Sequence, residues 1–70
     1  MSVQQIGKQI QKRRKALRII QADLSEIAGV SLRTIKAIEK GDANPTIDVL
    51  NRVLEPLGLS ITATERIKHE

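Results

Sequence analysis

Apolar residues recur at helical spacing along most of this chain and divide it into consecutive amphipathic segments. The first stripe has apolar side chains three or four positions apart at Val3, Ile6 and Ile10, and continues two turns later at Leu17. Ser2 and Gln5 have the spacing of a capping box, which marks the start of a helix. The pattern therefore predicts a first helix from Ser2 to about Arg18.

Two shorter helical segments, residues 21–28 and 32–40, follow around a turn of three residues. Their apolar positions also recur at helical spacing: Leu24, Ile27 and Ala28 before the turn, Ile35 and Ile38 after it. Gly29 can adopt the positive φ that ends a helix, and the hydroxyl group of Ser31 can cap the next one. Two helices joined by such a turn predict a helix-turn-helix.

A fourth helix is predicted after the loop Gly41–Pro45, with Thr46 as its cap. Its expected buried residues are Ile47, Leu50, Val53 and Leu54. Because Pro56 lacks an N–H group, this helix should end near Leu54 or kink, and a short turn through Leu57-Gly58 should close the domain. The sequence thus predicts an all-α domain of five helices in residues 1–58.

The C-terminal residues 59–70 follow a different pattern. Apolar side chains at Leu59, Ile61 and Ala63 alternate with Ser60, Thr62 and Thr64, which predicts a β-strand. One strand needs a partner, and pairing with the same segment of a second subunit would supply it in a homodimer. The alternative is a frayed polar tail, and residues 64–70 are expected to fray in either case.

The segment 32–40 also carries the candidate chemistry. If Ile35 and Ile38 face the core, rotation by 100° per residue places four residues on the opposite side, Arg33, Lys36, Ala37 and Lys40, with Leu32 at the edge. The DNA major groove admits an α-helix, Arg can bind guanine bidentately, and small apolar groups suit the thymine methyl group. Arg33 is therefore the first candidate for base reading, with Leu32 and Ala37 as apolar contacts.

Lys36 and Lys40 are better suited to phosphates, which set register without carrying sequence. The alternative for this whole face is an ordinary solvated helix surface.

Composition supports a polyanionic partner. The 70 residues allow one small domain, and 12 Lys and Arg against 8 Asp and Glu give a net charge of +4. Six basic residues fall in the first eighteen positions, which hold no acidic residue: Lys8, Lys12, Arg13, Arg14, Lys15 and Arg18. With no cysteine, neither a disulfide nor a thiolate metal site is available. No other metal and no cofactor is expected. No membrane span or secretory signal is apparent, so a cytoplasmic location is expected.

The central segment resembles the helix-turn-helix of the phage repressor/Cro class, the xenobiotic-response-element family of bacterial regulators. The residues that carry the resemblance span about residues 6–58: Gln21, Ser25, Gly29, Ile35, Glu39-Lys40-Gly41 and Asn44-Pro45-Thr46. The resemblance implies a lambda-repressor-like DNA-binding domain. One departure is Ile20, because relatives usually place a capping Thr or Ser there.

The resemblance also assigns roles to residues. Gln21 would contact a phosphate, and the segment from Ser31 through Thr34 to Ala37 would face the groove. Arg14 would pair with Glu39, tying the first helix to the recognition helix. The alternating tail resembles that of repressor-like antitoxins whose C-terminal strands join across a dimer.

These inferences predict a sequence-specific regulator that binds double-stranded DNA at a palindromic operator and represses its own operon. The alternative is an antitoxin that acts mainly by binding a toxin protein. An enzyme is disfavoured, because the one histidine, His69, lies near the end and no cysteine or glycine-rich phosphate loop is present. Single-stranded nucleic acid is disfavoured by the absence of Phe, Tyr and Trp.

Overall fold

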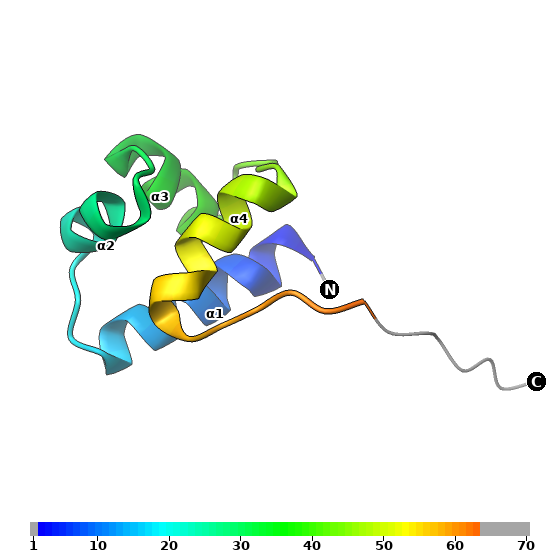
Figure 1. The fold of residues 1–70 in the computed structure, drawn as a ribbon. Coiled ribbons are helices and arrows are strands. Elements are labelled where there is room, and N and C mark those ends of the chain that lie inside the picture. The colour runs from blue at the N-terminus through cyan, green and yellow to red at the C-terminus, as the bar shows by residue number, and fades with distance from the viewer. Residues whose placement is uncertain (1, 64–70) are drawn as a thin grey trace, which may run out of the picture.

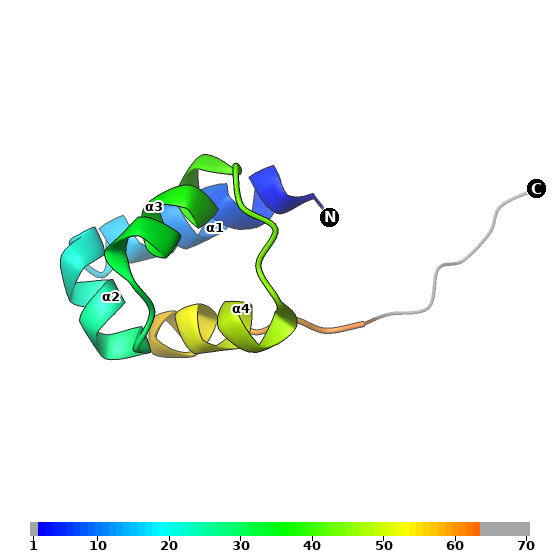
Figure 2. The ribbon, with the colours of Figure 1, turned by 90° about the horizontal axis from the view of Figure 1, so that it is seen from above.

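A computed structural model describes residues 2–63, which form four α-helices and one short 3-10 helix. The elements are α1 (Val3–Ala16), α2 (Gln21–Ala28), α3 (Leu32–Lys40), α4 (Ile47–Leu54) and η1 (Glu55–Leu57). Figure 1 shows α3 above α1, with α4 crossing in front of them. Seen from above, α1 and α3 lie together on one side and α4 on the other, with α2 at one end (Figure 2).

The first helix begins where the sequence predicts and ends slightly earlier. Ser2 Oγ accepts a hydrogen bond from the Gln5 N–H group at 3.1 Å, and the Ser2 N–H group donates to Gln5 Oε1 at 2.8 Å. This confirms the capping box. The helix ends at Ala16, because Arg18 adopts a left-handed φ of 58° and its N–H group turns back to the carbonyl of Lys15. A non-glycine residue is uncommon in that conformation, so no local pattern predicts it.

The turn between α2 and α3 has the predicted geometry. Gly29 ends α2 with a φ of 66°, and its N–H group bonds to the carbonyl of Ser25. The hydroxyl group of Ser31 accepts a hydrogen bond from the N–H group of Thr34 at 3.1 Å and caps α3. Both the helix end at Gly29 and the cap at Ser31 are therefore confirmed.

A single apolar core forms where all the helices meet. Its buried residues are Ile10, Leu24, Ile35, Ile38, Leu50, Val53, Leu54 and Leu57. Three residues predicted to lie on buried apolar stripes are exposed, so these predictions are wrong: Leu17 at 41%, Ile27 at 60% and Ile47 at 68%. Leu17 comes directly after the last residue of α1. Ile27 lies on the flank of α2 beside Arg52 and Pro56, and Ile47 occupies the first position of α4, ahead of the core.

The expectation of a fifth α-helix is also wrong. Leu54 is the last residue of α4, and the segment that follows is a three-residue 3-10 helix with Pro56 in its first turn. Gly58 closes it with a φ of 70°. Because proline cannot donate to the helical ladder, the chain makes only a tight turn here.

The C-terminal β-strand is not found in residues 59–63. Leu59 packs against the core and its N–H group bonds to the carbonyl of Leu54, but no residue after it joins a backbone hydrogen bond within the described part. A strand needs a neighbouring strand, and the helical domain offers none. The predicted fraying of residues 64–70 lies outside the described residues.

Candidate nucleic-acid interface

The outer surface of α3 contains the residues that the sequence singled out. Ile35 and Ile38 are buried at 0% and 1% exposure, so the opposite side of the helix faces solvent. The exposed residues there are Ser31, Leu32, Arg33, Lys36 and Lys40, with Thr34 and Ala37 half-buried. We call this set of seven residues the α3 face. Three positive charges and two small or apolar groups therefore share one accessible surface.

A buried ion pair holds α3 against α1. Arg14 Nε lies 2.7 Å from Glu39 Oε2, and Arg14 Nη2 lies 2.9 Å from Glu39 Oε1, so the guanidinium binds the carboxylate through two parallel hydrogen bonds. The third arm of Arg14 donates to the carbonyl of Ile19 at 2.8 Å, just before α2. The side chains are 9% and 2% exposed. The hydrogen bonds that Arg14 donates to Glu39 raise the pKa of Arg14 above its ordinary value, so Arg14 stays charged.

Gln21 belongs to the same cluster. Its side-chain Nε2 donates to Glu39 Oε1 at 3.2 Å, which links the first residue of α2 to the end of α3. That amide nitrogen is thus directed toward the buried ion pair, and the contact of Gln21 with a DNA phosphate stays a prediction. The cap itself is weak, because Ile20 has no capping side chain and its N–H group is 3.4 Å from Asp23 Oδ2.

Three residues of the α3 face have partners within the chain: Ser31, Thr34 and Lys40. Ser31 Oγ donates to Thr34 Oγ1 at 2.8 Å, so these two hydroxyl groups serve the helix start. Lys40 lies 3.5 Å from Asp42 in a well-exposed ion pair, which solvent weakens. Within residues 2–63, Arg33 and Lys36 form no ion pair, so their charges are available to a ligand.

The residues predicted for a dimer strand lie away from the α3 face. Leu59 is half-buried against the core, Ile61 is 39% exposed, and Ala63 is exposed. The C-terminal segment leaves the domain on the side of α1 and α4, below α3 in Figure 1.

The sequence reasoning missed Gly7, which sets the spacing between α1 and α3. A Cβ atom built on Gly7 would lie 2.3 Å from the carbonyl oxygen of Ile38 and 3.0 Å from that of Glu39. Two helix backbones therefore touch at this position. A glycine inside a helical pattern indicates such close packing, so the position of Gly7 within the first predicted helix could have predicted this contact.

Comparison with known proteins agrees with this geometry. The sequence model of the family described as "Helix-turn-helix" matches residues 10–63. The chain therefore belongs to the helix-turn-helix family, and the resemblance found in its sequence is confirmed at that level. The likeness to antitoxins stays a prediction.

Two relatives carry the name "Uncharacterized HTH-type transcriptional regulator". The one from Methanothermobacter thermautotrophicus is 39% identical over 49 residues, which cover 70% of this chain and 71% of the relative. The one from Haemophilus influenzae is 39% identical over 49 residues, which cover 70% of this chain and 50% of the relative. This chain thus spans about half the length of the second relative.

The part of the chain that the structure describes shows neither a metal centre nor a membrane span. Among residues 2–63, no group of three or more His, Cys, Asp or Glu side chains is placed to hold a metal ion. None of the helices described is both long and apolar enough to cross a membrane.

Proposed function

We propose that this protein is a regulator of transcription that binds double-stranded DNA in a sequence-specific way. The observation that carries the proposal is the α3 face, which presents unpaired basic groups on a helix whose other side is buried. Family membership and the names of the two relatives support it. A rigid helix with an exposed basic side is suited to the major groove.

Each residue of the α3 face has a role suited to its chemistry. Arg33 would bind a guanine through two hydrogen bonds, and Leu32 and Ala37 would contact thymine methyl groups. Lys36 and Lys40 would bind phosphates and fix the position of the helix on the duplex. The ion pair of Arg14 and Glu39 would keep α3 in a fixed orientation, because it joins that helix to α1 and the start of α2.

Replacement of Arg33 tests the assignment of base reading. Arg33→Ala is expected to weaken binding to the preferred duplex by about 1–3 kcal/mol and to relax selection at one base position. The measurement is fluorescence anisotropy on a duplex selected from a random library and on a scrambled duplex of the same length. Equal weakening on both duplexes would show that Arg33 contacts only phosphates.

Arg52→Ala is the matched control for this test. Arg52 lies on α4, is exposed, and is 3.4 Å from Asp48, so its removal takes away one positive charge outside the α3 face. The control variant should keep the wild-type preference for the selected duplex.

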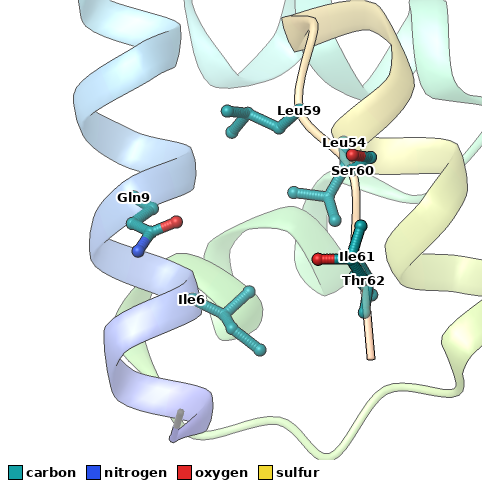
Figure 3. Close-up of a pocket in the computed structure, with 7 residues that line it drawn as sticks. All are labelled: Ile6, Gln9, Leu54, Leu59, Ser60, Ile61 and Thr62. Carbon is teal, nitrogen blue, oxygen red and sulfur yellow. The ribbon is translucent and has the colours of Figure 1, made fainter. Parts of the chain in front are cut away.

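We also propose that two copies of the chain bind a palindromic operator. An apolar hollow of about 100 Å³ lies between α1 and the C-terminal segment, lined in part by Ile6, Leu54, Leu59 and Ile61 (Figure 3). A domain of this size buries only about 60% of its unfolded surface, so burial against a second copy would add stability. Association on this side would leave both α3 faces free to occupy successive major grooves, about 34 Å apart.

Ile61→Ser tests this association. If Ile61 is buried between two copies, its loss should weaken self-association at least tenfold, because burial of an Ile side chain contributes about 1.5–3 kcal/mol. Ile27→Ser is the control, since Ile27 is also exposed but lies on the flank of α2. Sedimentation velocity over a range of concentrations measures the effect. An equal response of both variants would contradict the assigned surface.

We further propose that the operator overlaps the promoter of the protein's own gene and that occupancy represses it. The experiment is footprinting of the purified protein on the DNA upstream of that gene. A protected segment with two-fold symmetry is expected, and protection without symmetry would argue against binding as a dimer.

A further inference from the structure

Three lysines form an exposed row on the outer side of α1. Lys8, Lys12 and Lys15 are separated by four and three residues, so they lie on successive turns of one side of the helix. All three are exposed, and none takes part in an ion pair within residues 2–63. The first eighteen residues contain no acidic side chain, so this lysine row is not neutralised by its own helix.

The lysine row does not belong to the α3 face, but the packing of α1 against α3 relates the two surfaces. Gly7 touches the carbonyls of Ile38 and Glu39, and a Cβ atom on Gly41 would lie 2.8 Å from the side chain of Gln4. Earlier residues of α1 thus meet later residues of α3, so the two helices are antiparallel. Figure 2 shows them side by side, with α4 on the opposite side.

The buried ion pair marks where the two helices meet. Because successive residues of α1 are 100° apart, the side chains met in turn around its circumference are those of buried Ile10, then Arg14, then Lys15 and Lys8. Around the circumference of α3, the corresponding order is buried Ile35, then Glu39, then Lys36 and Lys40. The core lies on one side of this line of contact in both helices. Lys8, Lys15 and the α3 face therefore project from the same side of the molecule. Lys12 lies further round α1, beside Gln9, Arg13 and Leu59.

From this arrangement we propose that the lysine row binds phosphates of the same DNA duplex, next to the groove segment that α3 occupies. This inference rests on the proposed function, because it takes the α3 face to be against DNA. Duplex DNA carries one negative charge for about every 1.7 Å of its axis, so a helix that lies beside α3 meets phosphates along its length. Lysine suits this contact, since its ammonium group binds phosphate without demanding a fixed geometry.

The binding would add affinity without sequence preference. Contacts to phosphates release counterions, and each one steepens the dependence of log K on log salt concentration by about 0.9. The lysine row would thus increase affinity for all duplexes alike, whereas Arg33 would separate one sequence from another.

Single replacements of the three lysines by glutamine, and the triple replacement, test this inference. Affinity is measured by anisotropy at several salt concentrations on the selected duplex and on a scrambled one. Removal of one lysine–phosphate interaction should reduce the salt slope by about 0.9 and weaken both duplexes by the same factor. Arg52→Gln is the control, because it removes the same unit charge from α4 and should leave the slope unchanged.

The length of the duplex distinguishes the sources of phosphate. On a duplex that ends at the edge of the recognised sequence, the wild type and the triple variant should bind with the same affinity. On a duplex extended by about ten base pairs, one helical turn, the triple variant should again bind more weakly than the wild type. Binding that instead requires a second duplex, seen as a dependence on the square of DNA concentration, would overturn the proposal. An unchanged salt slope in the triple variant, with its helical content intact by circular dichroism, would overturn it as well.

Failure of the proposed function would look different. In that case the wild-type protein would bind the selected and the scrambled duplex equally. The effect of the lysine replacements on the salt slope can still be measured on such a protein. A failure of sequence-specific binding can therefore be distinguished from a failure of the lysine–phosphate contact.

Discussion

Glu39→Ala is expected to lower the free energy of unfolding by about 3–5 kcal/mol, because it leaves the guanidinium of Arg14 charged and buried without its partner. Glu39 is 2% exposed and accepts hydrogen bonds from both Arg14 and Gln21. A domain of 70 residues has a total stability of about 4–10 kcal/mol, so this loss takes a large share of it. Urea denaturation followed by circular dichroism measures the change.

Two comparison variants show whether the burial of the charge causes the loss. The double variant Arg14→Met with Glu39→Leu replaces the pair by apolar groups and should recover most of the stability. Asp48→Ala breaks the exposed pair with Arg52 at 3.4 Å and should cost no more than about 0.5 kcal/mol. If Glu39→Ala costs no more than Asp48→Ala, the ion pair does not hold α3 in place.

Gly7→Ala is expected to cost about 3 kcal/mol, at the upper end of the range for overpacking, although alanine favours helices more than glycine does. The added methyl group would lie 2.3 Å from the carbonyl oxygen of Ile38, and both atoms belong to packed helices that cannot turn away. Relief of this contact requires α3 to move away from α1. Denaturation measures the stability, and anisotropy on the selected duplex should show weaker binding at the same time.

Gly29→Ala is the control for this variant. It adds the same methyl group where nothing lies within 4 Å, so its cost comes only from the φ of 66°. That cost is about 1–2 kcal/mol for an L residue. If Gly7→Ala proves no more costly than Gly29→Ala, the close contact between α1 and α3 is contradicted.

The sequence predicts the helix-turn-helix because its signals are local. Gly29 and Ser31 specify a turn through their own backbone and side-chain preferences, and the structure confirms both. Ile35 and Ile38 give the buried side of α3 by their spacing, and the outer side follows by rotation. Such features depend on residues within about four positions of one another.

The errors arise where burial depends on residues distant in the chain. Ile27 and Ile47 have the spacing of core residues, but the helices that could cover them pass elsewhere. The alternation in residues 59–63 has the period of a strand, yet a strand exists only with a neighbour, and the described chain provides none. Arg18 takes a left-handed conformation that its residue type does not favour.

The amino-acid sequence by itself determined the helix-turn-helix, its caps and the side of α3 that faces solvent. Only the tertiary structure decided how closely α1 and α3 approach at Gly7 and which oxygens Arg14 binds. It alone brought Lys8 and Lys15 of the lysine row to the same side of the molecule as the α3 face. The physical reason is that spacing along a helix gives the direction of each side chain, whereas the position of one helix against another comes from the packing of many residues at once.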